Sequence, residues 1–154
     1  MKGRFCRSGN VRITVRDLDG NIIEQIVKPN LIVNVGLNMV RDMLAGDVAD
    51  GEIKYIALGT NAAAPAMGDT QLGTEIFRKV ITSSTKPAVG QWNSVWYIAP
   101  AEAVAAIEEI GFFAGAGAVA GADTGILIAR ILYSRNKTNL ESLQISRLDS
   151  FEEA

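Results

Sequence analysis

Three charged residues lie within strongly apolar stretches of the chain: Arg78, Glu109 and Arg130. A buried charge needs a partner, because removing an unpaired ion from water is very costly. A carboxylate between two guanidinium groups would satisfy all three residues. Such a structural ion network would fix the register of strands rather than perform chemistry. The alternative is that the three residues lie separately at the surface.

Two other segments match the residue pattern of a binding motif but not the other features that the motif requires. Residues 115–120 (GAGAVA) fit GxGxxA, but the glycines that follow interrupt the helix that a dinucleotide site requires. Asp17, Asp19 and Asn21 alternate as in a calcium loop, yet Lys28 stands where the bidentate glutamate belongs. We therefore expect a surface loop and a turn, with no cofactor and no metal.

The chain contains no histidine, and Cys6 is its only cysteine. Histidine is the commonest general base at neutral pH, so Ser-His-Asp and Cys-His chemistry are excluded. Glu108 and Glu109 are adjacent, and adjacent side chains point away from each other in a strand. Paired-carboxylate catalysis is therefore poorly supported, and we expect that the protein is not an enzyme.

Trp92 and Trp96 belong to one expected strand, Trp92 to Ala99, and share one of its faces. Aromatic residues in a sheet are typical of a core. A half-exposed pair would instead anchor an interface, so both remain candidate interface residues.

The composition is that of one globular domain of 154 residues, of which 48% are hydrophobic and 21% are charged. The net charge of −2 gives no reason to expect nucleic acid or an anionic membrane as a partner. The longest weakly apolar uncharged stretch, residues 110–122, is too short for a bilayer span. No signal peptide is recognisable, which predicts synthesis in a cytoplasm.

Residues 1–10 carry several basic side chains with little to pack, and we interpret them as an N-terminal arm. An arm of this kind is either disordered alone or ordered against a neighbour. Its candidate interface residues are Lys2, Arg4, Phe5 and Arg7. The remainder, 11–154, is expected to be a single β-rich domain.

The domain opens with a predicted hairpin. Val11–Val15 and Ile22–Val27 alternate or are rich in apolar residues, and Asp17–Asn21 between them contains an Asp-Gly turn. A short helix follows. Its apolar face consists of Leu37, Val40, Met43 and Leu44. Asn34 is its expected N-cap, and Gly46 is placed to end it.

Short strands separated by turns make up the rest of the chain. We expect them at residues 53–58, 77–83, 92–99, 126–133 and 143–151, with a small-residue loop at 61–69 and a Gly/Ala loop at 114–125. Residues 103–113 are ambiguous, because alanine and glutamate favour a helix while the alternation of Ile107, Glu109 and Gly111 favours a strand. We interpret them as a strand because the resemblance given below implies one. The predicted fold class is mainly β with a minor α part. Its architecture is a β-sandwich or a small β-barrel, with one short helix after the N-terminal hairpin.

Four segments resemble a class of small virion proteins of tailed bacteriophages. Residues 30–46 are similar to NLI-x-N-x-GL…LL-x-G, and residues 56–78 to LGTG-x-x-AP-x-x-DT-x-L-x-x-E-x-x-R. Residues 107–113 resemble I-x-EIGLF, and 125–130 resemble G-x-LLAR. The resemblance extends from about Asn30 to Phe151, although Asn61 replaces a common glycine and Phe112 a common leucine.

This resemblance implies a virion structural protein made in the cytoplasm of a bacterial host. The leading expectation is a capsid decoration (cement) protein, a homotrimer whose partners are its own copies and the major capsid protein. A tail collar, baseplate or fibre adaptor that binds tail proteins is the alternative. A third reading is a glycan-binding tail module that uses Trp92, Trp96 and a carboxylate such as Glu108 or Asp123.

Overall fold

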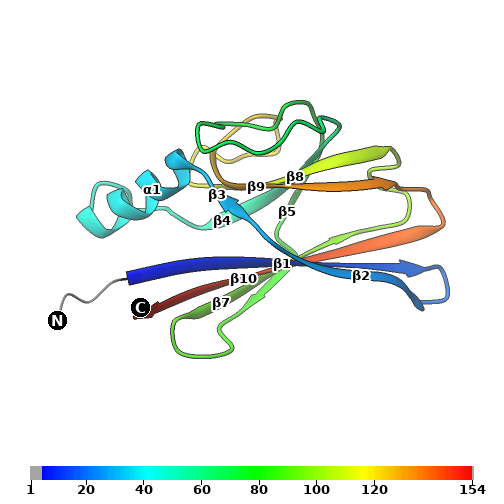
Figure 1. Ribbon diagram of the computed structural model, residues 1–154, viewed down its shortest axis with the longest axis horizontal. Coiled ribbons are helices and arrows are strands. Elements are labelled where there is room, and N and C mark those ends of the chain that lie inside the picture. The colour runs from blue at the N-terminus through cyan, green and yellow to red at the C-terminus, as the bar shows by residue number, and fades with distance from the viewer. Residues whose placement is uncertain (1–4, 154) are drawn as a thin grey trace.

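The computed structural model describes residues 5–153 and shows two antiparallel five-stranded sheets packed face to face (Figure 1). The first sheet has the order β2 (Ile22–Pro29), β1 (Phe5–Asp17), β10 (Glu141–Glu153), β7 (Gln91–Ile98) and β6 (Ser83–Thr85). The second has the order β3 (Leu31–Ile32), β9 (Ile126–Asn136), β8 (Ala106–Ala114), β4 (Ile53–Gly59) and β5 (Glu75–Val80). The expected mainly β class is confirmed, and the architecture is the sandwich, not a closed barrel.

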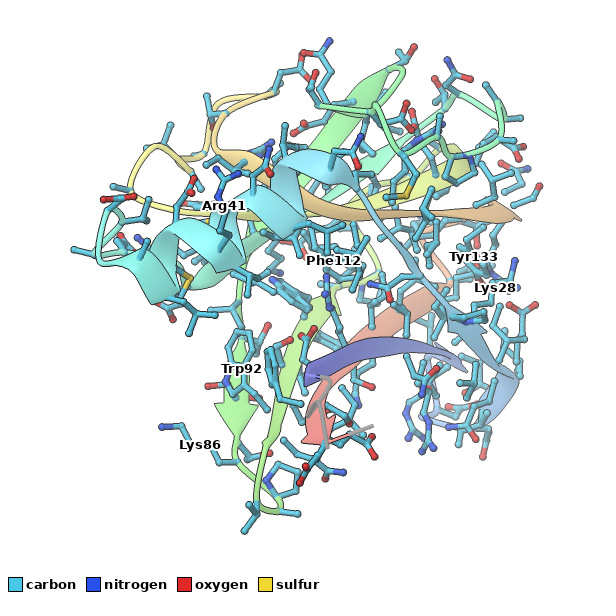
Figure 2. The ribbon with its side chains drawn as sticks, turned by 60° about the vertical axis from the view of Figure 1, so that its left-hand side comes forward. Lys28, Arg41, Lys86, Trp92, Phe112 and Tyr133 are labelled. Atoms are coloured by element: carbon cyan, nitrogen blue, oxygen red, sulfur yellow. The ribbon has the colours of Figure 1, made fainter. Side chains whose placement is uncertain are left out.

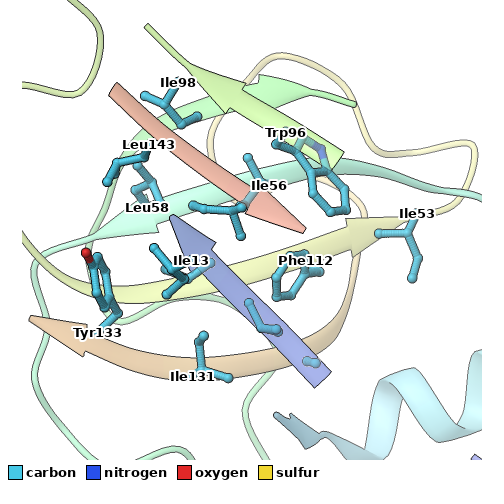
Figure 3. Packing of buried hydrophobic residues seen from close by; sticks show 14 of the residues in the cluster. Ile13, Ile53, Ile56, Leu58, Trp96, Ile98, Phe112, Ile131, Tyr133 and Leu143 are labelled. Carbon is cyan, nitrogen blue, oxygen red and sulfur yellow. The ribbon is translucent and has the colours of Figure 1, made fainter. Parts of the chain in front are cut away.

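Alternating side chains from the two sheets fill the space between them (Figure 3). On β1, Val11, Ile13 and Val15 point inward and are fully buried, as their period of two predicts. Across the gap, the rings of Trp96 and Phe112 lie 5.3 Å apart at a tilt of 52°. This tilted contact is one of the arrangements that aromatic pairs prefer.

The strand β1 begins at Phe5, so the predicted boundary between an arm and a domain at residue 10 is wrong. Residues 5–10 pair with β10, from Phe5 opposite Glu153 to Asn10 opposite Leu148. Polar residues tolerate this position because pairing between strands uses backbone groups and not side chains. Residues 1–4 lie outside the described part of the chain.

The single helix of the described chain, α1 (Asn34–Ala45), ends as expected at Gly46, which adopts a left-handed conformation with φ of 80°. Its beginning differs from the prediction, because Val33 is the N-cap and no side chain caps the first turn. The predicted buried face is also wrong. The helix buries Gly36 and Met39 instead of the predicted apolar row.

Two loops cover the outer face of the second sheet. The loop between β4 and β5 contributes Leu72, and the Gly/Ala loop between β8 and β9 contributes Ala118. With Phe113 and Leu127 of the sheet, these residues form a second, smaller core. The second sheet is therefore buried on both faces, which explains why β8 is buried along nearly its whole length.

Candidate interaction surface

An apolar groove of about 560 Å³ opens between α1 and the end of the first sheet. The helix lies above the N-terminal end of β1 in Figure 1, and Trp92 lies below the helix in Figure 2. One wall of the groove comes from α1, the floor from β4 and β9, and the other wall from β7 and β10. The apolar lining residues are Met39, Val40, Met43, Leu44, Ile53, Trp92, Ile128 and Phe151.

The first turn of α1 lies close against the second sheet. A Cβ atom added at Gly36 would lie 2.5 Å from the carbonyl oxygen of Ile128, so only glycine permits this approach. In the later turns, apolar side chains stay exposed. Met43 remains 44% exposed and Leu44 78% exposed. An apolar ridge therefore stands beside an apolar groove, and such continuous apolar surface is typical of a binding site.

Charged groups mark the rim and the inner end of the groove. Glu52 and Lys86 are exposed, while Asp149 is buried and accepts a hydrogen bond from Arg147 Nη2 at 2.7 Å. The Arg147 guanidinium also lies 5.1 Å from the centre of the Phe112 ring. The interior end of the groove is therefore closed by a buried ion pair, and its mouth is apolar with a charged rim.

The two candidate tryptophans have different environments. Trp96 is completely buried, and its indole N–H points to the carbonyl oxygen of Lys54 at 3.4 Å. Trp92 is partly exposed and lines the groove. Trp96 is therefore a core residue and Trp92 alone belongs to the candidate surface. A sugar platform made from both rings is not formed.

Of the candidate residues near the N-terminus, Lys2 and Arg4 lie outside the described residues. The backbones of Phe5 and Arg7 belong to β1 and pair with Glu153 and Phe151, respectively. Their side chains are outside the part of the chain that the structure describes.

Of the two ion pairs expected for Glu109, the one with Arg130 is present. Arg130 Nε donates to Glu109 Oε2 at 2.7 Å, and both side chains are almost fully buried. Glu109 also accepts hydrogen bonds from the backbone amides of Asn61, Gly73 and Thr74 at 2.9–3.2 Å. Burial raises the pKa of Glu109, but these amides and the guanidinium outweigh burial and leave its pKa lowered. The pair anchors the loop between β4 and β5.

Arg78 does not reach Glu109, so the predicted three-residue network is wrong in this part. Arg78 and Glu109 stand on β5 and β8, and β4 separates them. Arg78 instead forms a bidentate pair with Glu75 at 2.7 and 2.9 Å and donates to the carbonyl oxygen of Thr124 at 2.7 Å. Its guanidinium lies 4.2 Å from the centre of the Phe113 ring. This second pair anchors the Gly/Ala loop.

Residues that carry the sequence resemblance meet in this layer on the second sheet. Leu72, Glu75, Arg78, Glu109 and Arg130 come from three of the four matching segments. Small residues of the sheet make room for them. A Cβ at Gly59, for example, would lie 2.4 Å from Glu109 Oε1 and 2.5 Å from the carbonyl oxygen of Thr74. The matching segments therefore encode how two long loops are held to the sheet.

Sequence reasoning missed two polar clusters, one buried around Lys137 and one half-buried around Arg135. Lys137 donates from Nζ to the carbonyl oxygens of Ala99, Pro100 and Thr138 at 2.9–3.2 Å, and burial lowers its pKa. Arg135 binds Glu24 at 3.0 Å and also binds Glu141, which joins the two sheets. Both clusters depend on contacts between distant segments, and no local pattern signals them.

The hydroxyl of Tyr133 donates to Glu24 Oε1 at 2.8 Å. Burial, and to a smaller extent this carboxylate, raises the pKa of the phenol.

The residues 115–120 form part of the loop between β8 and β9, and no helix follows them, as expected. Within residues 5–153, no group of three or more histidine, cysteine, aspartate and glutamate side chains could hold a metal ion. In the same range, no helix is long and apolar enough to cross a membrane.

No protein-family model matches the chain, and neither a curated protein nor a solved structure is significantly similar to it.

Proposed function

We propose that this chain is a non-enzymatic structural protein of a tailed-phage particle, and that it acts as a capsid decoration (cement) protein. It would work by self-association and by docking on the major capsid protein. The four resembling segments support the virion class. The apolar groove and the helix ridge beside it support docking.

The groove is the observation that carries the proposal. Binding surfaces combine a central apolar anchor with a polar rim, and the groove has both: Trp92, Met43 and Leu44 beside Glu52 and Lys86. The buried charges elsewhere hold the protein's own loops and sheets together. Their hydrogen bonds are directed to backbone groups and to ion-pair partners, and this arrangement serves stability.

Cosedimentation with undecorated capsids tests the proposal. Leu44→Asp places a charge on the helix ridge at a position that is 78% exposed, so the fold should tolerate it. Leu140→Asp is the matched control, because Leu140 is 61% exposed in the turn between β9 and β10. We expect capsid binding by the wild type and the control. For Leu44→Asp we expect weakening of about tenfold, equivalent to about 1.4 kcal/mol.

The composition of purified particles separates head from tail. A decoration protein is present in hundreds of copies, whereas a collar, baseplate or fibre adaptor is present in a few. Failure to bind capsids, together with a low copy number on tails, would replace the decoration proposal with the adaptor. Equal capsid binding by both aspartate variants would show that the groove is not the docking surface.

A further inference from the structure

The outer edge of β2 has the properties of a pairing edge. Within residues 5–153 no strand pairs with this side of β2. Ile22, Ile23 and Val27 are 50%, 54% and 56% exposed along it. Edge strands usually carry charges, prolines or bulges that prevent pairing with another chain. β2 carries charges too, but its proline and its bulge stand at the two ends of the strand, and between them exposed apolar side chains lie beside unpaired backbone groups. This central part of the edge is able to accept a strand.

The register with β1 identifies which backbone groups face outward. Pro29 has no N–H and cannot form a hydrogen-bonded pair with β1, whereas the amide of Asn30 donates to the carbonyl oxygen of Gly9. Hydrogen-bonded and non-hydrogen-bonded pairs alternate in an antiparallel ladder, so the even-numbered residues of β2 bond to β1. Gln25 and Val27 therefore direct their N–H and C=O groups to the free edge.

We propose that β2 pairs with β2 of a second copy of this chain, antiparallel, about a two-fold axis at Ile26. In this register Gln25 of each copy exchanges both backbone hydrogen bonds with Val27 of the other. All outward-facing groups of these two residues are then satisfied. Pro29 ends the ladder on one side, and the bulge between Val15 and Arg16 distorts it on the other.

Charge complementarity selects this register. Centred on Ile26, the pairing places Glu24 of one copy directly opposite Lys28 of the other, twice by symmetry. Opposite charges across a ladder stabilise it, and like charges destabilise it. Centring on Gln25 would place Glu24 opposite Ile26 and leave both charges without a facing partner.

Both charges are already held at this edge. Tyr133 donates to Glu24 Oε1 at 2.8 Å, Arg135 Nη1 donates to Glu24 Oε2 at 3.0 Å, and Lys28 Nζ donates to the carbonyl oxygen of Leu132 at 2.9 Å. Lys28 and Tyr133 lie on the side of the molecule away from α1 (Figure 2). The charges are therefore positioned before association, which lowers the entropy lost on pairing.

This inference specifies the self-association that the proposed function requires, and it replaces the expected homotrimer with a two-fold contact. Its tests need no phage particle. A dimer that ignores capsids would refute the proposed function alone. Capsid binding by a protein without β2 pairing would refute this inference alone.

A disulfide tests the register. In a Cys6→Ser background, Ile26→Cys places two thiols across a non-hydrogen-bonded pair, where Cα atoms lie about 4.5 Å apart, within disulfide range. Gln25→Cys is the control, because Gln25 faces Val27 of the other copy. We expect a disulfide-linked dimer from Ile26→Cys only. A dimer only from Gln25→Cys, or from neither variant, would overturn the proposed register.

A proline tests the edge itself. Val27→Pro removes an outward N–H and leaves the hydrogen bonds to β1, whereas Val27→Thr keeps the amide. By light scattering we expect a dimer for the wild type and Val27→Thr, and half that mass for Val27→Pro with an unchanged circular dichroism spectrum. A wild-type monomer, a trimer, or a dimer that tolerates the proline would overturn the proposal.

Discussion

Replacement of Glu109 by glutamine removes the charge of the buried carboxylate and keeps its shape. The two carboxylate oxygens accept four hydrogen bonds: Oε1 from the amides of Asn61 and Thr74, and Oε2 from the amide of Gly73 and from Arg130 Nε. A glutamine has one acceptor oxygen, and its other terminal group is itself a donor. Two of the four donors therefore lose their acceptor whichever way the amide turns.

The expected loss of stability follows from what remains around Arg130. Its guanidinium keeps Asp69 at 3.1 Å and the carbonyl oxygen of Ala63 at 2.9 Å, so it stays partly satisfied. Removal of one partner from a buried pair costs about 3–5 kcal/mol, and we expect the lower end, about 3 kcal/mol. A domain has about 5–15 kcal/mol in total, so the variant should fold but unfold at clearly lower urea concentration.

Urea unfolding measures the global loss of stability, and amide hydrogen exchange measures the local loss at individual amides. Glu108→Gln is the matched control, because the Glu108 carboxylate accepts from the exposed hydroxyl of Ser134 and should change stability by less than about 0.5 kcal/mol. In Glu109→Gln, the amides of Gly73 and Thr74 should exchange faster, beyond the global loss of stability. A difference of less than about 1 kcal/mol between the two variants, which is below the cost of unsatisfied buried donors, would refute the reasoning.

Three further outcomes follow from the described contacts. The folded-state pKa of Glu109 is lowered from 4.5. The free energy that the ionised carboxylate contributes to folding is therefore present above pH 4.5 and is lost as the pH falls through the folded-state pKa. The free energy of unfolding of Glu109→Gln should consequently fall less steeply with decreasing pH. Gly36→Ala should cost about 1–3 kcal/mol through overpacking against β9, whereas Gly68→Ala, with no atom within 4 Å of the added Cβ, should cost nothing in urea unfolding. Trp96→Ala should cost about 3–5 kcal/mol and Trp92→Ala less, and acrylamide should quench the fluorescence of Trp92 but not that of Trp96.

Periodicity in the sequence predicts most of the strands. Alternation at Val11, Ile13 and Val15 survives because β1 has one buried face, so register and pattern agree. The start of β1 was missed because residues 5–10 contain little alternation. Their pairing with β10 depends on a partner at the far end of the chain.

The helix shows where a local pattern fails. Leu37, Met43 and Leu44 form an apolar row at helical spacing, yet each is at least 44% exposed. The helix is buried at Gly36 and Met39 instead, and the close approach at Gly36 contributes nothing to an apolar pattern. An apolar row thus has two meanings, a core face or a binding face, and only the tertiary structure separates them.

Only part of the ion network was predicted correctly, again because a local pattern does not show the tertiary contacts. Buried charge in an apolar context correctly indicates that a partner exists, as for Glu109 and Arg130. It does not indicate which partner. Arg78 pairs with Glu75, which lies three residues before it on β5. A partner this close in the chain is held near Arg78 by the backbone, whereas Glu109 lies two strands away.

The pairing of β1 with β10 has a consequence for the order of folding. These strands are neighbours in the middle of the first sheet, although even their nearest paired residues, Asp17 and Glu141, lie at opposite ends of the sequence. During synthesis β1 can form only its hairpin with β2 until the last strand has left the ribosome. Contacts over such a separation slow folding, since a long loop must close first. The first sheet can therefore be completed only after β10 has been synthesised, and we expect the closure of β10 onto β1 to be a slow step of folding.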